Sequence, residues 1–286
     1  MKKILLAVTA ALAITGCSQN EEFDNAGQNA EISFGTIVRN STRADILTTD
    51  NMKTFTVSGY KTAANMAADT QLTADFINGL KVDKNGSNWE YGGDTFYWPY
   101  SGKVHFFGTS PAQTLNITSL GYPTFEYTVK NVAAQEDLVA ANLINKDKAS
   151  GALMLPFQHL LTQVNFSIKG DTPGFTYTVT KIVLMGMKDK ATFKFNGENT
   201  VGTWEGVTAS DANLKYEHTG SFTVIPKAGE EVKTGLEETD KALFMLMPQD
   251  ASSVKLTITY SAVNGEQKGF SGEKDVTLTG TWTMGH

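Results

Sequence analysis

Apolar and polar residues alternate along much of the chain with a period of two, which places successive side chains on opposite faces of a β-strand. Thr and Ser fill many of the positions between the apolar residues, as in strands with one solvent-facing side. The clearest runs are Ile32, Phe34 and Val38; Phe55 and Val57; Val164, Phe166 and Ile168; Phe222 and Val224; Leu256 and Ile258; and Val276, Leu278, Trp282 and Met284. The pattern predicts an all-β protein.

Turn signals separate these runs. Asn85-Gly86, Asn196-Gly197 and Asn264-Gly265 each lie between apolar stretches, and Asn-Gly favours a tight hairpin turn because both residues tolerate a positive φ. Many short strands joined by such turns indicate a β-sandwich. Residues 62–80 depart from the pattern, because their mixture of Ala, Met, Leu and polar residues fits either a helix or an irregular loop over a sheet edge.

The length of 286 residues allows two domains, each with its own core. The stretch 145–151 is polar and lacks a core-forming residue, and a new apolar run begins at Leu153. We therefore expect an N-terminal β-sandwich domain over 31–150 and a C-terminal β-sandwich domain over 151–286.

Residues 1–16 have the composition of an export signal peptide, in which Lys2 and Lys3 precede an apolar stretch. That stretch, of about eleven residues, is too short to span roughly 30 Å of hydrocarbon as a helix. Ile14-Thr15-Gly16-Cys17 then has the form of a bacterial lipobox, and Cys17 is the single cysteine, so no internal disulfide can form. We expect Cys17 to be the lipid attachment site; the alternative is a residual cysteine after an ordinary signal peptide.

Residues 17–30 follow as an acidic tether, whose start is similar to the surface-export signals of lipoproteins in the Bacteroidetes. Two or three acyl chains on Cys17 would hold the protein firmly on a membrane. The expected location is therefore the cell surface, as an outer-membrane lipoprotein precursor.

The search for catalytic motifs is negative. The sequence contains no Gly-rich phosphate loop, HExxH or G-x-S-x-G, and its four histidines lack metal-ligand spacing, so we expect no enzyme, cofactor or metal site. The formal charge of −6 without a basic stripe argues against nucleic acid as a partner. The histidines are His105, His159, His218 and His286.

Three features are open to a functional interpretation. His159 lies in an apolar run, but we interpret it as a hydrogen-bonded core histidine because the sequence shows no nucleophile or partner carboxylate. Residues 83–88 begin like a calcium loop but lack its later Gly and Glu, and a hairpin accounts for them. Six aromatic residues over 89–100 form either a sandwich core, which we favour, or a sugar-stacking platform: Trp89, Tyr91, Phe96, Tyr97, Trp98 and Tyr100.

Several motifs occur in a distinctive order between Cys17 and the end of the sequence. They are the lipobox, the run 32–38 followed by Ser41-Thr42-Arg43-Ala44, Tyr97-Trp98-Pro99 followed by Val104-His105-Phe106-Phe107, Asp137-Leu138-Val139-Ala140, LPFQHLLTQVNFSI at 155–168, and Phe244-Met245-Leu246-Met247-Pro248-Gln249. Together they resemble the fimbrillin family, which comprises the type V pilins and related lipoproteins of Bacteroidales.

The resemblance implies two tandem transthyretin-like β-sandwich domains and assembly into surface fimbriae by donor-strand exchange. In that process a protease cuts after an arginine, the lipidated N-terminal strand leaves, and a strand of a neighbouring subunit fills the vacated groove. Transferred to this sequence, the lipid is on Cys17 and the processing site is Arg43, with Arg39 as an alternative. Arg43 could instead be an ordinary exposed residue of a polar linker.

The expected function is therefore that of a structural fimbrial subunit. Its expected partners are other fimbrial subunits, the outer membrane before processing, and a host or bacterial surface ligand. Family members commonly continue into a Tyr-rich strand after a Trp-x-x-Gly turn, whereas this sequence stops at Trp282-Thr283-Met284-Gly285-His286. Either the sequence lacks that final strand of the protein, or the subunit itself has none, which suggests a tip or minor pilin that accepts a strand without donating one. The alternative is a surface lipoprotein that binds glycan or protein and does not polymerise.

The substitution Cys17→Ala should abolish lipid labelling and leave the precursor unprocessed or released, because no other thiol is present to accept the lipid. Labelling cells with a tagged fatty acid and fractionating their membranes checks this prediction. Retention of the variant in the membrane at wild-type levels would show that Cys17 is not the anchor.

Overall fold

The computed structural model describes residues 30–38, 47–197, 201–229, 233–235, 243–265 and 267–285. The signal peptide 1–16, Cys17, Arg39, Arg43 and His286 lie outside these residues. Within them the regular elements are β-strands apart from three short 3-10 helices, which confirms the predicted all-β class. None of the helices in these ranges is long and apolar enough to cross a membrane.

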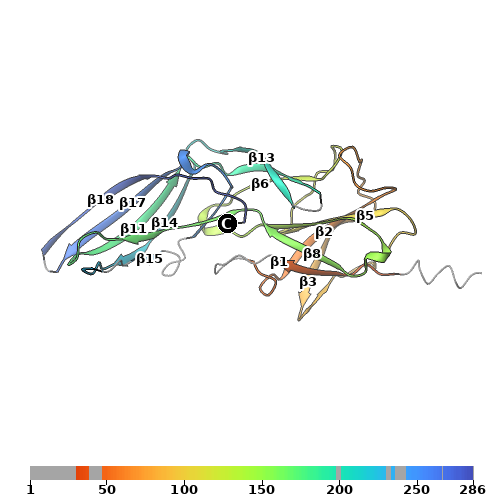
Figure 1. Cartoon of the computed structure of the whole chain (residues 1–286), viewed down its shortest axis with the longest axis horizontal. Helices are drawn as coiled ribbons and strands as arrows, with labels where there is room; N and C mark the ends of the chain where they lie inside the picture. The colour runs from red at the N-terminus through yellow and green to blue at the C-terminus, as the bar shows by residue number, and fades with distance from the viewer. Residues whose placement is uncertain are drawn as a thin grey trace, which may run out of the picture.

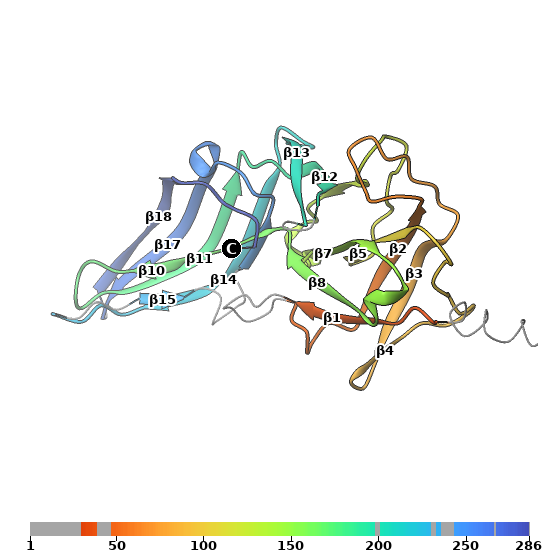
Figure 2. The same cartoon turned by 45° about the vertical axis from the view of Figure 1, so that its right-hand side comes forward.

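Seven strands form one sheet in the N-terminal half, in the order β1-β8-β7-β5-β2-β3-β4 (Figures 1 and 2). They are β1 (Phe34–Val38), β2 (Thr54–Thr62), β3 (Ile77–Asn85), β4 (Asn88–Glu90), β5 (Lys103–Ser110), β7 (Val139–Lys146) and β8 (Leu153–His159). Neighbouring strands run antiparallel except β1 and β8, which are parallel. The sheet curls so far that its two edge strands, β1 and β4, come into contact.

The curled sheet encloses the first hydrophobic core, which contains Phe55, Phe106 and Phe157. The predicted aromatic cluster contributes to this core in part. Trp98 is buried in it, three further rings pack against it, and Tyr97 and Tyr100 are exposed. The three packed rings belong to Trp89, Tyr91 and Phe96.

A three-stranded sheet, β13-β12-β6, contributes with the outer face of the curled sheet to a second core. Its strands are β6 (Thr124–Thr128), β12 (Lys190–Phe195) and β13 (Gly202–Thr208). Phe107 of β5 packs on Phe195 of β12, with ring centroids 5.0 Å apart. Because Phe106, the preceding residue, points into the first core, β5 is buried on both faces.

The second core continues into the C-terminal half, where a four-stranded sheet, β14-β11-β17-β18, faces two short sheets, β16-β9 and β10-β15 (Figure 2). The long strands are β11 (Thr176–Met185), β14 (Lys215–Val224), β17 (Lys255–Asn264) and β18 (Gln267–Thr277). The short ones are β9 (Thr162–Asn165), β10 (Ser167–Lys169), β15 (Lys233–Gly235) and β16 (Leu243–Leu246). Three 3-10 helices complete the described elements: η1 (Val132–Ala134), η2 (Lys148–Ser150) and η3 (Ala251–Ser253).

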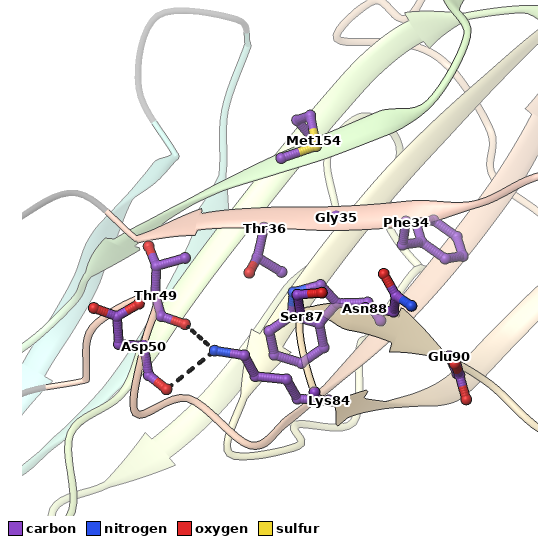
Figure 3. A pocket seen from close by; sticks show the side chains of 12 residues that line it. Phe34, Gly35, Thr36, Thr49, Asp50, Lys84, Ser87, Asn88, Glu90 and Met154 are labelled. Carbon is purple, nitrogen blue, oxygen red and sulfur yellow. Dashed lines mark hydrogen bonds between the residues drawn. The ribbon is translucent and has the colours of Figure 1, made fainter.

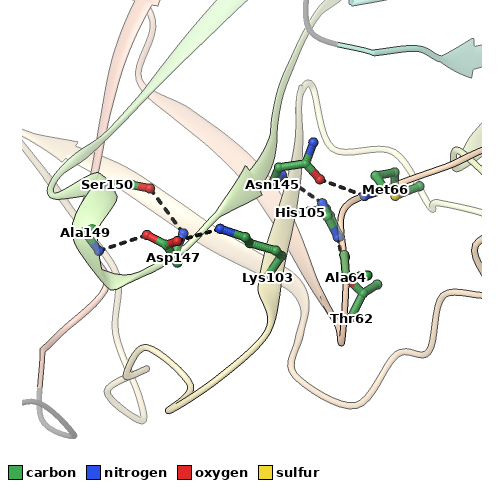
Figure 4. Close-up of polar contacts among 9 residues, drawn as sticks. All are labelled: Thr62, Ala64, Met66, Lys103, His105, Asn145, Asp147, Ala149 and Ser150. Atoms are coloured by element: carbon green, nitrogen blue, oxygen red, sulfur yellow. Dashed lines mark hydrogen bonds and ion pairs between the residues drawn. The ribbon is translucent and has the colours of Figure 1, made fainter.

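Strand pairing crosses the boundary that we expected at residues 145–151. β8 follows this stretch but pairs with β7 and β1, while β6 precedes it and pairs with β12. The polar residues form a reversal: Asp147 caps η2 and binds Lys103 of β5 at 2.6 Å (Figure 4). The polar stretch is therefore a turn within one sheet, and a division at 150/151 does not follow the strand pairing.

The strands beside each predicted Asn-Gly turn pair antiparallel, β3 with β4, β12 with β13, and β17 with β18. Residues 83–88 accordingly belong to the β3–β4 hairpin.

Residues 63–76 form an irregular stretch between β2 and β3, not a helix. The predicted last strand is too long, because β18 ends at Thr277 and Gly280 takes a φ of 93°. Trp282 lies beyond that break and exchanges backbone hydrogen bonds with Gln249.

His105 of β5 is fully buried, and both of its ring nitrogens form hydrogen bonds (Figure 4). Nδ1 accepts the backbone N–H of Asn145 at 3.0 Å, so Nε2 carries the proton and donates to Thr62 Oγ1 at 2.6 Å. The side-chain oxygen of Asn145 in turn accepts the N–H of Met66. These bonds hold the irregular stretch after β2 against β5 and β7.

Burial lowers the pKa of His105 from 6.5 to about 4. Because the unfolded chain takes up this proton near pH 6.5, stability that is present above that pH is lost as the pH falls toward 4. At about 1.4 kcal/mol per pKa unit, we expect a loss of roughly 3 kcal/mol by pH 4. Urea unfolding of the wild type and of His105→Gln between pH 7 and 4 checks this, since the variant should show a flatter profile. An equally steep profile in the variant would assign the loss to other groups.

Candidate functional site at the edge strand β1

β1 lies at the edge of the curled sheet, with β8 as its strand partner. Five residue pairs run in parallel register, from Phe34 opposite Leu153 to Val38 opposite Phe157. The carbonyl of Ser33 accepts the N–H of Leu153 at 3.1 Å. Because the backbone groups of successive residues point to opposite sides of a strand, the odd-numbered residues of β1 bond toward β8 and the even-numbered ones face away from it.

The side chains of this segment divide by the same alternation, as its sequence predicted. Ile37 is 53% exposed, whereas the inward-facing side chains are at most 6% exposed. The inward-facing residues are Ile32, Phe34, Thr36 and Val38. Full burial of an apolar side chain of this size contributes about 1.5–3 kcal/mol, so the segment stabilises the first core by several kcal/mol.

The backbone groups that face away from β8 have partners at the two ends of the segment. At one end the Ile32 N–H donates to the Phe96 carbonyl at 2.9 Å, and the Ile32 carbonyl accepts the Tyr91 hydroxyl at 2.8 Å. At the other end the Val38 N–H donates to Thr49 Oγ1 at 2.9 Å. Between these ends, no strand of the described part of the chain pairs with this side of β1.

An open groove of about 920 Å³ lies beside this unpaired stretch, between β1 and the β3–β4 hairpin (Figure 3). Lys84, Asn88 and Glu90 line it from the hairpin. Thr36 lines it from β1, and its buried hydroxyl has no hydrogen-bond partner among the described residues. The groove therefore combines polar side chains with an unpaired length of strand edge.

Residues 47–52, which we call the anchor loop, close one end of the groove. Lys84 Nζ donates to the carbonyls of Thr49 and Asp50 at 2.7 and 3.0 Å (Figure 3). The N–H of Leu47 donates to Asp137 Oδ2 at 3.0 Å, and Met52 is fully buried. The loop is thus fixed to β3 and to Asp137, just before β7, as well as to β1.

His159 is buried, as we expected, but it has a carboxylate partner that the sequence did not reveal. Its Nδ1 lies 2.7 Å from Oδ2 of Asp137, the same atom that accepts the Leu47 N–H. The two residues are 22 positions apart and meet because Val139 of β7 pairs with His159 of β8. Only the register of these strands could have identified the pair.

The sequence-predicted lipid and processing sites lie outside the described residues. Cys17 precedes them, and Arg43, like its alternative Arg39, belongs to residues 39–46, between the end of β1 and the anchor loop. The structure therefore describes the chain on both sides of Arg43, at Val38 and at Leu47.

A family model, a curated relative and a solved structure to which this chain is similar have fimbrial names. A family model described as fimbrillin-like matches residues 42–286. The fimbrium subunit Fim1C of Phocaeicola vulgatus is 27% identical over 252 residues, which cover 75% of this chain and 65% of that protein, so the chain spans less than two thirds of its relative. A crystal structure of a fimbrial protein from Bacteroides vulgatus, 18% identical, superposes with a TM-score of 0.63 over 90% of this chain and 91% of that one. This likeness supports the fold.

Two substitutions on β1 test how the strand is held. Phe34 contacts the rings of Phe55, Tyr91 and Phe106 at centroid distances of 5.7–6.4 Å, so Phe34→Ala should lower the free energy of unfolding by about 3–5 kcal/mol. Ile37→Ala, on the exposed face, should change it by less than about 0.5 kcal/mol. Denaturant unfolding of both variants measures the difference. Similar losses in both would contradict the observed orientation of the strand.

Proposed function

Because the chain belongs to the fimbrillin-like family, we propose that it is a structural subunit of a cell-surface fimbria that accepts a strand from a neighbouring subunit in place of β1. The edge position of β1 carries this proposal. A central strand would leave two broken ladders if it were removed, whereas removal of β1 interrupts one, the ladder with β8. The core would lose side chains that another strand with the same alternation can replace.

The vacated site would have the chemistry that strand addition requires. Removal of β1 uncovers the edge of β8, with backbone N–H and C=O groups that need new partners. It also uncovers apolar side chains of the first core, among them Phe55 and Phe106, which Phe34 now covers. An incoming strand with alternating apolar residues would restore both the ladder and the core.

The sequence upstream of β1 supports a membrane-bound precursor. In this proposal Cys17 carries the lipid that holds the precursor on the outer membrane, and cleavage at Arg43 separates the lipidated segment and β1 from the rest of the chain. After the cut, the segment is held by its ladder with β8, by its side-chain contacts and by the hydrogen bonds at its two ends, and no longer by a covalent link. Strand exchange then releases the subunit into the fimbria.

The open groove favours a second candidate, a surface lipoprotein that keeps β1 and binds glycan or protein without polymerising. The residues that line the groove include Trp89 together with the charged residues Asp50, Lys84 and Glu90, a combination suited to a polar ligand with apolar faces. Because β1 forms one wall, this groove exists only while the strand is in place. The fimbrial subunit must therefore lose β1, whereas the surface lipoprotein must keep it.

Processing of the surface protein distinguishes the two candidates. The mature fimbrial protein should begin at Ala44, and Arg43→Ala should stay full length and be absent from fimbriae, because the strand cannot leave an uncut chain. Terminal sequencing of protein sheared from cells measures this, with Arg39→Ala as the matched control, which should be processed normally. Surface protein that keeps its N-terminus and its function would support the lipoprotein instead.

The cleaved protein should also form a stable heterodimer with a donor-bearing pilin of the same fimbria, whereas uncut Arg43→Ala should not. Incubation of the cleaved protein alone tests the expected tip position. A ladder of polymers in that sample would show that the subunit belongs to a repeating shaft.

A further inference from the structure

The anchor loop holds a hydrogen-bond acceptor at the end of the β1 site. Thr49 Oγ1 accepts the N–H of Val38, the last residue of β1. The loop does not depend on β1 for its position, because Lys84 binds the carbonyls of Thr49 and Asp50 and Asp137 binds the N–H of Leu47. The hydroxyl is thus fixed by the body of the protein while its partner belongs to the strand.

The order of these residues along the chain gives the acceptor a role after processing. Residues 47–52 follow Arg43, so they stay with the body when the chain is cut there, whereas Val38 leaves with β1. The vacated site then ends at a hydroxyl whose backbone donor is gone. We propose that Thr49 determines the register of the incoming strand by accepting its backbone N–H at the position of Val38; this inference rests on the proposed strand exchange.

The site needs such a marker because a β-ladder alone does not fix the register. A slip of one residue turns the apolar side chains outward and is strongly disfavoured, but a slip of two residues keeps every side chain on its face. For a strand that ends at this position, an acceptor there penalises the second error: a strand slipped back by two residues no longer reaches Thr49, and one slipped forward by two extends past the anchor loop. Thr49 therefore complements the aromatic pocket around Phe34.

The same contacts determine which residues an incoming strand can have at particular positions of the site. The residue at the Val38 position must have an N–H, which excludes proline. A Cβ at the Gly35 position would lie 2.5 Å from Met154 Sδ, but this atom is near the end of a flexible, exposed side chain that can move aside, so the position does not exclude larger residues. An apolar or aromatic residue is required at the Phe34 position, where the side chain enters the first core.

Asp137 and His159 position the loop that carries the acceptor, Thr49 Oγ1. The carboxylate holds Leu47 at the start of the anchor loop, and the imidazole fixes the carboxylate from β8. Two motifs that lie apart in the sequence, Asp137-Leu138-Val139-Ala140 and the run containing His159, thereby converge on the loop that presents Thr49.

The full chain, cut by protease at Arg43 with β1 still in place, provides the test. Cut protein is mixed with excess synthetic peptide of residues 30–38, and release of the N-terminal fragment is followed by mass spectrometry. Thr49→Val should release the fragment roughly fivefold faster than wild type, because it lacks one hydrogen bond to the strand. Thr49→Ser, which keeps the hydroxyl, should behave like wild type.

Peptides methylated on one backbone nitrogen test the same bond without altering the protein. Methylation at Val38 should weaken competition for the wild-type site roughly fivefold but leave competition for Thr49→Val unchanged. Methylation at Thr36, whose N–H faces the unpaired side of β1, is the matched control and should affect both proteins equally.

The outcomes separate this inference from the proposed function. Equal release from wild type and Thr49→Val, or an equal effect of Val38 methylation on both, would overturn the role of Thr49 while leaving strand exchange intact. Absence of release from every variant, with all proteins cut at Arg43, would overturn strand exchange itself.

Discussion

The N-terminal half of the fold depends on a core that is completed by one edge strand. The inward-facing side chains of β1 belong to the first core, yet its backbone is joined to the sheet by the single ladder with β8. Burial of its side chains provides most of the free energy that keeps β1 in the sheet. Such burial is not specific to one polypeptide, since any strand with apolar residues at the same alternate positions can supply it. A protein that is stable with β1 in place is therefore compatible with the proposed exchange of that strand.

The parallel direction of β1 fits this independence. Strands joined by hairpins, such as β3 and β4, are bound to their neighbours by the turn between them. β1 and β8 are distant in sequence, and no short connection forces them together. Their association rests on the ladder, on burial of the segment in the first core and on the hydrogen bonds at its ends. A cut between β1 and β2 leaves the described strand pairings unchanged.

The sequence predicts those features that depend on neighbouring residues. The period of two identifies the inward face of β1, and Asn-Gly identifies three antiparallel pairs, because both signals act over a few positions. The pairing of Asp137 with His159 and the position of Thr49 depend on which distant strands become neighbours, and one sequence carries no local signal for that. The pairing of β7 with β8 across residues 145–151 has a related cause, since a polar stretch marks a turn whether the chain then enters a new sheet or returns to the same one.

Loss of a core strand would unfold many small domains, and in the proposed exchange the double burial of β5 is what would let the rest of the fold withstand it. Phe106 points into the first core, which contains the side chains of β1, while Phe107 points into the second core, to which none of residues 30–38 contributes. The second core extends over β12, β11 and β17, so it holds β5 in place from the other side. An empty β1 site would weaken one face of the sheet while the opposite face keeps β5 and its neighbours aligned, which preserves the template that the next strand must recognise.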